Sequence, residues 1–318
     1  MKKTLALLSM LLLTVSISAE SYSIFYKGKF CGIIDENRKV ISEPVYERIR
    51  ITEQGYLECV KNNMEVDFFD KKMNKTLSFS HVTFIWQYSE DEWIIHKNGE
   101  LSFSLINLKT KEISKGIKLE SKENCPTFIN NVGVILTFYK EIGKYGYTIT
   151  KRDGKTIVSN IAQADSEFSE GMLPVLFFDG KTGYLDYDGK LVIEIPLYED
   201  FRMEGLRISP SLFYRFHEGV AFIQTEKDNW YLLDKQGNKK KVPTDYSFTT
   251  RRYSNGLTVV ENSKHRFGYM DKNFKLVIPC KFENANSFEG KYAAVIYQGK
   301  DAVVDAEGNV YFCEEFKK

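Results

Sequence analysis

Short apolar runs separated by polar turn sequences fill most of this chain. Representative runs are Val220–Ile223, Leu257–Val260 and Ala293–Ile296, each flanked by glycine, asparagine or charged residues. Apolar runs of this length between turn residues are typical of β-strands, and few residues lie at helical spacing. The pattern therefore predicts an all-β protein built from short strands.

Two kinds of turn separate the apolar runs. The first is a two-residue turn, found at Asn98-Gly99, Asp179-Gly180 and Gln298-Gly299. Asparagine, aspartate and glycine tolerate the positive φ that a tight hairpin requires. The second is Asp-x-x-Gly, as in Asp186–Gly189 and Asp234–Gly237, where the aspartate can accept backbone amide protons. A third apolar run follows, often ended by proline, so each stretch of chain predicts three antiparallel strands.

One phrase, made of an aromatic residue, Gly, an apolar pair and Asp, recurs eight times in variant form. Aligned on the aspartate position, the copies fall at Asp35, Asp70, Asn107, Lys151, Asp186, Asp234, Asp271 and Asp305. This regular spacing, 34 to 48 residues, indicates tandem structural repeats. No proline- or glycine-rich linker interrupts them, so we expect a single domain of about eight units over residues 20–318.

The predicted strands are apolar on both faces, and this pattern indicates how the units pack against one another. A sheet with one wet face would alternate apolar and polar residues. Strands that are apolar on both sides favour small sheets stacked face to face, each burying its neighbour. The chain has no distinctive polar end units, and closure of the array would leave no exposed end sheet. We therefore expect a propeller-like ring, with an open β-solenoid or superhelix as the alternative.

At these repeats the chain resembles the WG-repeat family, also called KWG repeats. The clearest copies read FSEGMLPV then TGYLDYDGKLVIEIPLY from Phe168 to Tyr198, and YSNGLTVV then FGYMDKNFKLVIPCKF from Tyr253 to Phe282. The Trp-Gly pair itself is nearly absent, and the only Trp in register, Trp230, is followed by tyrosine. The resemblance implies a divergent secreted bacterial member of the family: a β-rich repeat scaffold, generally without catalytic activity.

The N-terminus has the pattern of a secretory signal. Lys2 and Lys3 precede an apolar run from Leu5 to Val15, and small residues lead to Ala19. A basic start, a short apolar segment and a small-residue site predict a signal peptide over residues 1–19. We therefore expect an exported protein, located in the periplasm, on the outer surface or outside the cell. No later segment approaches the length of a transmembrane helix.

The charge balance argues against nucleic acid as a partner. Without Lys2 and Lys3 the chain has 42 basic and 43 acidic residues, so it has no basic excess to neutralise phosphates. Five cysteines share no spacing and no CxxC occurs, so we read them as small buried apolar residues.

The connection between the fifth and sixth aligned units is longer than most others and is the candidate binding site. In repeat folds, insertions gather on one face, which is often the binding face. Aromatic and arginine side chains are typical interface anchors. The candidate residues are Tyr198, Phe201, Arg202, Arg207, Phe213, Tyr214 and Arg215. The alternative is that this loop packs its own aromatic side chains over the edge of its unit.

No catalytic or metal-binding set stands out. Asp186–Gly189 begins like a calcium loop but lacks the third ligand and the distal glutamate. Four histidines share no ligand spacing, so we expect neither a metal nor a cofactor. Carboxylates such as Glu170 and Asp186 could act as the acid and base of a glycosidase if the fold brought them together.

We therefore expect a non-enzymatic exported scaffold that binds a protein or a cell-envelope ligand. The alternatives are a carbohydrate-active hydrolase on a propeller fold and a purely structural component of the envelope.

Overall fold

The computed structural model describes residues 22–52, 55–62, 64–100, 102–117, 126–129, 134–141, 144–151, 155–165, 167–196, 214–226 and 229–317. The signal peptide expected over residues 1–19 lies outside these residues, so it stays a prediction.

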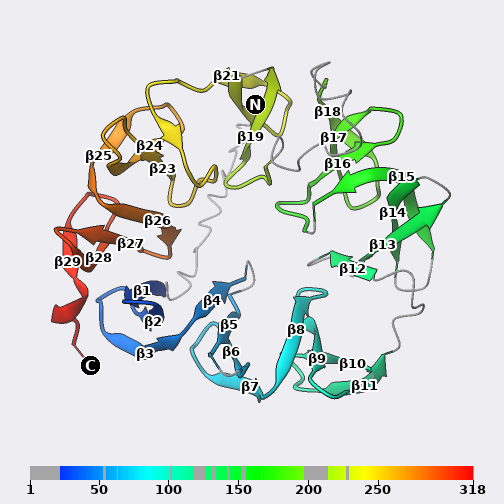
Figure 1. Ribbon diagram of the computed structural model, residues 1–318, viewed down its shortest axis with the longest axis horizontal. Helices are drawn as coiled ribbons and strands as arrows, with labels where there is room; N and C mark the ends of the chain where they lie inside the picture. Colours follow the sequence, from blue (N-terminus) through cyan, green and yellow to red (C-terminus); the bar gives the residue numbers. More distant parts are fainter. Residues whose placement is uncertain are drawn as a thin grey trace, which may run out of the picture.

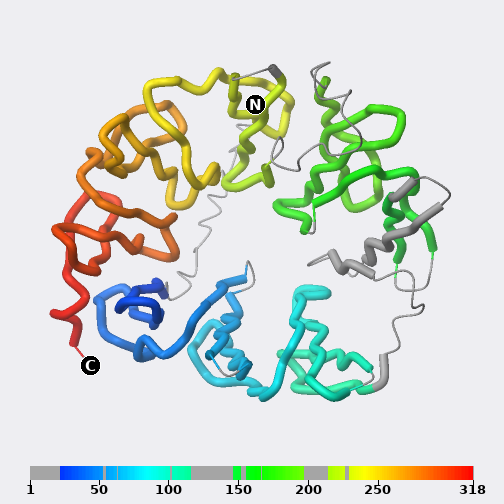
Figure 2. Tube along the Cα trace, in the orientation of Figure 1, coloured from blue at the N-terminus to red at the C-terminus, as the bar shows by residue number. Residues whose placement is uncertain are grey.

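Seven antiparallel sheets stand in a ring and form a β-propeller (Figure 1). The chain circles the ring once from the N-terminal sheet to the C-terminal one (Figure 2). Among the described residues the one helical element is a short 3₁₀ turn, η3 (Cys313–Glu315), and no helix is long and apolar enough to cross a membrane. The all-β prediction and the propeller-like ring are confirmed.

The first three sheets follow one another along the chain. Their strands are β1 (Ser23–Lys27), β2 (Phe30–Ile34) and β3 (Val40–Tyr46); β4 (Arg48–Ile51), β5 (Leu57–Val60), β6 (Val66–Phe69) and β7 (Lys75–Phe79); and β8 (Val82–Gln87), β9 (Glu92–Lys97), β10 (Phe103–Asn107) and β11 (Ile113–Ile117).

The fourth sheet has seven strands and contains two of the repeat units. Its strands are β12 (Pro126–Ile129), β13 (Val134–Glu141), β14 (Lys144–Lys151), β15 (Thr156–Ala164), β16 (Leu173–Phe177), β17 (Thr182–Leu185) and β18 (Leu191–Glu194). The long strand β15 is shared, because its first half pairs with β14 and its second half pairs with β16. Elsewhere the equivalent chain is split into two strands of different sheets, such as β3 and β4.

The last three sheets complete the ring. Their strands are β19 (Val220–Glu226), β20 (Asn229–Asp234) and β21 (Lys239–Lys241); β22 (Ser247–Phe248), β23 (Leu257–Glu261), β24 (Phe267–Asp271) and β25 (Leu276–Phe282); and β26 (Asn284–Glu289), β27 (Tyr292–Tyr297), β28 (Lys300–Val304) and β29 (Val310–Phe312).

The ring closes between the first and last sheets. Strand β1 packs against β27 and β28. Phe25 and Ile34 of the first sheet share one apolar cluster with Tyr292 and Val303 of the last. The backbone N–H of Val40 donates to a carbonyl five residues beyond the last strand, that of Lys317, at 2.9 Å. These contacts exclude the open solenoid.

Several units contain a fourth, inner strand that the three-strand pattern did not predict. Strands β4, β8 and β26 lie on the inner side of the ring (Figure 1), and β22 is the corresponding edge strand of its sheet. They were missed because proline was expected to end the preceding strand. Pro279 instead lies inside β25, where the register shifts between Phe267 and Tyr269 of the partner strand. A bulge lets a strand continue through a residue that cannot donate a hydrogen bond.

The apolar cores lie between neighbouring sheets. One cluster joins Tyr269 and Ile278 to Phe288 and Val295 of the next sheet. Tyr269 is fully buried, and its hydroxyl donates to the carbonyl of Asn286, also in the next sheet, at 2.9 Å. Each unit therefore buries its faces only against its neighbours, as the two-sided apolar strands predict.

A glutamate of the aromatic-x-Glu-Gly phrase links each of two units to the next. Oε2 of Glu170 accepts the backbone N–H of Gly219 at 3.0 Å and lies 3.0 Å from Nζ of Lys235. The same three-way contact recurs one unit later at Glu218. We call this arrangement the glutamate latch.

Two of the cysteines behave as small apolar residues. Cys31 and Cys59 are fully buried free thiols in the core between the first two sheets. Burial raises the pKa of Cys31 to about 11, which keeps its thiol protonated at neutral pH. Cys280 and Cys313 are half-buried, and Cys125 lies outside the described residues.

Candidate functional site

The antiparallel order of the strands gives the ring two different ends. In such a meander, successive turns lie alternately at opposite ends of the strands. The Asp-x-x-Gly turns share one end, and the tight hairpins and the connections between sheets share the other, which we call the hairpin end. The long connection that begins after β18 therefore starts from the hairpin end.

A cavity of 590 Å³ opens at the hairpin end between the sheets of β19–β21 and β22–β25. We call it the Trp230 pocket. Its lining residues are Phe222, Trp230, Val242, Pro243, Thr244, Asp245, Tyr246, Ser247, Phe248, Arg251, Glu261, Asn262, Ser263 and His265. Phe222, Val242 and Phe248 are buried, so the wall is apolar, while the remaining residues add polar groups. Clefts of this size with a few polar groups are typical of ligand sites.

An arginine held by two aromatic rings forms one side of this pocket. The guanidinium carbon of Arg251 lies 4.5 Å from the centroid of the Trp230 ring and 5.3 Å from that of Tyr214. Nη1 of Arg251 also donates to the hydroxyl of Tyr214 at 2.8 Å. Two cation–π contacts and a hydrogen bond restrict the orientation of this guanidinium.

The lining of the pocket also includes a histidine and a carboxylate. Nδ1 of His265 lies 2.6 Å from Oε1 of Glu261, on the hairpin between β23 and β24. Asp245 and Asn262 add exposed or half-buried acceptor groups. The pocket therefore offers one fixed cation and several hydrogen-bond acceptors around an apolar wall.

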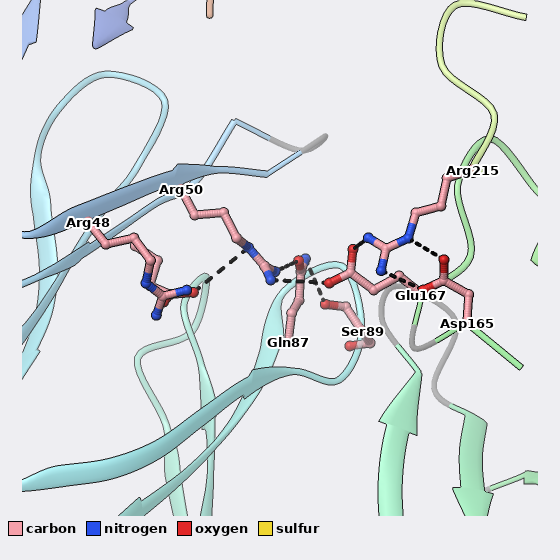
Figure 3. A network of polar contacts seen from close by, with 8 residues as sticks. Arg48, Arg50, Gln87, Ser89, Asp165, Glu167 and Arg215 are labelled. Atoms are coloured by element: carbon pink, nitrogen blue, oxygen red, sulfur yellow. Dashed lines mark hydrogen bonds and ion pairs between the residues drawn. The ribbon is translucent and has the colours of Figure 1, made fainter. Parts of the chain in front are cut away.

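A second polar cluster, the arginine network, crosses the inside of the ring (Figure 3). Its members come from sheets that are not all adjacent: Arg48, Arg50, Glu58, Gln87, Asp165, Glu167 and Arg215.

Arg50, on the inner strand β4, is the centre of the arginine network. Its Nη2 donates to Oε1 of Gln87 at 2.8 Å, and its Nη1 lies 3.3 Å from Oε1 of Glu167. Glu167 in turn is hydrogen-bonded by Arg215, which also binds Asp165 through Nε at 2.9 Å. The chain of contacts therefore ties the second and third sheets to the far side of the ring.

Every carboxylate of the arginine network is paired with an arginine. Glu58 is 2% exposed, and burial raises its pKa against the opposing charges of Arg48 and Arg50. For Arg215, burial lowers the pKa, but the hydrogen bonds and charges of Asp165 and Glu167 outweigh it and raise the pKa overall. These carboxylates are held in ion pairs. The network therefore acts as a structural clamp, which means that it holds sheets of the ring together.

A smaller cavity of 380 Å³ is lined by residues of the first two sheets and the last two. It is lined by Ile24, Tyr26, Ile49, Thr250, Arg252, Asn286, Ser287, Glu289, Tyr292 and Ala294. Arg252 and Glu289 form an ion pair in its wall. Burial, together with the charges of Arg252 and Arg215, lowers the pKa of nearby His217 to about 4, so this imidazole is neutral at pH 7.

The structure places only two of the predicted binding residues. Tyr198, Phe201, Arg202, Arg207 and Phe213 lie outside the described residues. Of the two that are described, Tyr214 packs at a tilt against Trp230 of the pocket, whereas Arg215 belongs to the arginine network.

The sequence reasoning missed Arg251, Glu167 and Arg50, because each lies in an ordinary-looking stretch far along the chain from its partners. One signal was available. Arg215 and Glu167 each stand directly before the aromatic residue of the aromatic-x-x-Gly phrase, and so does Arg252. Charged residues at one position of a repeat meet on one side of the ring.

The proposed acid and base pair, Glu170 and Asp186, is not a pair in the structure. Glu170 belongs to a glutamate latch. Oδ1 of Asp186 accepts the backbone N–H groups of Asp188 and Lys190 at 3.0 and 2.9 Å, which closes the turn after β17. Among the described residues, no group of three or more histidine, cysteine, aspartate or glutamate side chains is placed to hold a metal ion.

The ring of sheets and the apolar cores between them define the class of this protein, which is a β-propeller built from repeated units. A family model described as a WG containing repeat matches residues 32–63 and 267–300, which confirms the resemblance to the WG-repeat family: these two segments are WG-type repeats. No curated protein matches the chain.

Solved structures with a similar fold include AztD from Citrobacter koseri, with a TM-score of 0.50 and 10% sequence identity over 93% of this chain and 92% of that one. Its apo form has a TM-score of 0.50 and 10% identity over 94% and 93% of the two chains. Dihydro-heme d1 dehydrogenase NirN in complex with DHE has a TM-score of 0.49 and 12% identity over 94% of this chain and 72% of that one. At such identity the likeness shows the propeller fold alone.

Proposed function

We propose that this chain is an exported, non-enzymatic propeller scaffold that binds a protein or a cell-envelope ligand at the hairpin end of its ring. The observation that carries the proposal is the Trp230 pocket. It lies at the end where the long connection after β18 departs, and Tyr214, at the end of that connection, packs against its wall. Aromatic and arginine side chains around a cleft are the usual anchors of binding sites.

A hydrolytic function is the less favoured candidate. A glycosidase needs one carboxyl group that can donate a proton and a second that acts as base or nucleophile. Asp165 and Glu167, on the inside of the ring, both form ion pairs with Arg215, so their carboxylate oxygens are already engaged. This pairing supports a clamp between sheets rather than acid–base chemistry.

The binding proposal is tested by affinity capture from a cell-envelope extract with two variants of the mature protein. One variant lacks residues 198–213, and the other carries Trp230→Ala in the pocket. We expect both to lose a partner that the unaltered protein recovers reproducibly. The matched control is Phe312→Ala, an aromatic truncation on the outer strand β29. Unchanged recovery by both pocket variants would count against the proposal.

Export is tested separately by expressing the full chain in a bacterial host and measuring the mass of the purified protein. Loss of residues 1–19 is the expected result. An intact N-terminus in the cytoplasmic fraction would contradict it.

A further inference from the structure

We propose that the Trp230 pocket recognises a carboxylate that is attached to an apolar group, and that Arg251 is the residue that binds it. The inference rests on the proposed binding function and names the chemistry of the ligand. Such a carboxylate can belong to the C-terminus of a protein chain or to a free organic acid.

The first argument is the orientation of the Arg251 guanidinium. A guanidinium that lies over an aromatic ring keeps the N–H groups of its edge free for acceptors in its own plane. Among the described residues, only Nη1 of this guanidinium donates a hydrogen bond, to the hydroxyl of Tyr214. Among the described residues no carboxylate forms an ion pair with Arg251, whereas Arg215 and Arg252 both do. The remaining N–H groups suit a carboxylate, which binds arginine through two parallel hydrogen bonds.

The second argument is the backbone of Arg251. Its φ is +47°, in the left-handed region that is strained for a residue with a side chain. Most other residues with positive φ, such as Arg38 and His265, lie in tight turns that require it. Arg251 lies in no such turn, but in the irregular segment between β22 and β23. Strain of this kind is retained where the surroundings hold a side chain in a particular place.

The third argument is the rest of the pocket. Phe222, Val242 and Phe248 offer an apolar wall beside the guanidinium, which suits an apolar group next to the carboxylate. Asp245, which is exposed, can accept an N–H group of a peptide backbone. Oε1 of Glu261 is already engaged by Nδ1 of His265 at 2.6 Å.

Isothermal titration calorimetry tests the proposal with defined probes. The probes are an acetylated pentapeptide ending in Leu-Phe with a free carboxylate, the same peptide with a C-terminal amide, and phenylacetate. We expect the free acid to bind at least about tenfold more tightly than the amide, because hydrogen bonds to a charged group are the stronger ones. Arg251→Gln should remove that difference, and Arg251→Lys should retain part of it.

A matched control is available in Arg38→Gln. Arg38 also has a positive φ, lies 3.9 Å from the ring centroid of Tyr311 and donates to the hydroxyl of Tyr292, but it lines neither cavity. This variant should bind like the unaltered protein.

Three results would overturn the carboxylate proposal: no heat with any probe at millimolar concentration, equal affinity for acid and amide, or a preference for the acid that survives Arg251→Gln. Phenylacetate as tight as the peptide would support the same chemistry and identify a small organic acid as its source. If Arg251→Gln still captures the partner lost by Trp230→Ala, the binding function stands and only its carboxylate chemistry fails.

Discussion

Single residues explain why the repeat phrase contains glycine. At Gly32, Gly183 and Gly268 the neighbouring outer strand passes so close that a Cβ atom would lie 2.5, 1.8 and 2.5 Å from its carbonyl oxygens. A backbone oxygen cannot move aside without breaking the sheet. The glycine is therefore required by the close approach of the bulged outer strand, and the residue before it differs between the three copies, being Cys31, Thr182 and Phe267.

Gly268→Ala should lower the free energy of unfolding by about 3 kcal/mol, because the new methyl group meets backbone atoms in a packed sheet. Urea denaturation measures the loss. The control is Gly237→Ala, where φ is +88° but the space around Cβ is open. There we expect only the conformational penalty, about 1 kcal/mol. Equal losses at the two positions would contradict the steric explanation.

At the scale of the element, the glutamate latch explains the second phrase of the repeat. Oε2 of Glu218 accepts the N–H of Gly256 at 2.9 Å and lies 3.3 Å from Nζ of Lys272, both in the next unit. Gly256 has a positive φ, as the turn requires, and this conformation points its N–H at the carboxylate. The aromatic-x-Glu-Gly phrase is therefore a joint between neighbouring units as well as a turn.

Glu218→Ala should destabilise the protein by about 1 kcal/mol, since the hydrogen bond is lost while the ion pair is half exposed and contributes little. Thermal unfolding followed by circular dichroism measures this change. Glu307→Ala removes an exposed glutamate from an Asp-x-x-Gly turn and should change stability by less than about 0.5 kcal/mol. A Glu218 variant as stable as this control would mean that the latch does not hold the units together.

At the scale of the whole molecule, the ring buries both apolar faces of a unit, one against the preceding unit and the other against the next. Residues of β23 and β24 face two clusters: Val259 and Tyr269 pack against the last sheet, while Val260 and Met270 pack against β19–β21. All four are fully buried in the ring, so a unit alone would expose both of its apolar faces. Stability should therefore belong to the array rather than to the unit.

An excised unit spanning residues 253–282 should be unfolded, because it would leave the faces of β23 and β24 in water at a cost of about 25 cal/mol per Å² of apolar surface. Its far-ultraviolet circular dichroism should lack the β-sheet signal of the full chain, and its thermal melt should show no cooperative transition. A soluble fragment that unfolds cooperatively would refute the account of the cores between sheets.

The sequence alone determined three strands of each unit, the turns and the stacking, because these depend on residues close together in the chain, but it did not reveal the inner strands. The aspartate of the Asp-x-x-Gly turn accepts the backbone N–H groups two and four positions later, at Asp186 as at Asp234. Local patterns also identified the long connection and its neighbour Tyr214, although most of that candidate site lies outside the described residues.

Only the tertiary structure decided which side chains meet. Arg50 and Glu167 are 117 positions apart, and Arg251 and Tyr214 are 37 apart. Their contacts depend on closure of the ring and on the angle between sheets, and no local pattern encodes either. The neighbours Tyr214 and Arg215 also contact different sites. Successive side chains of an extended chain point in opposite directions, so Arg215 joins the arginine network inside the ring while Tyr214 packs against the wall of the Trp230 pocket.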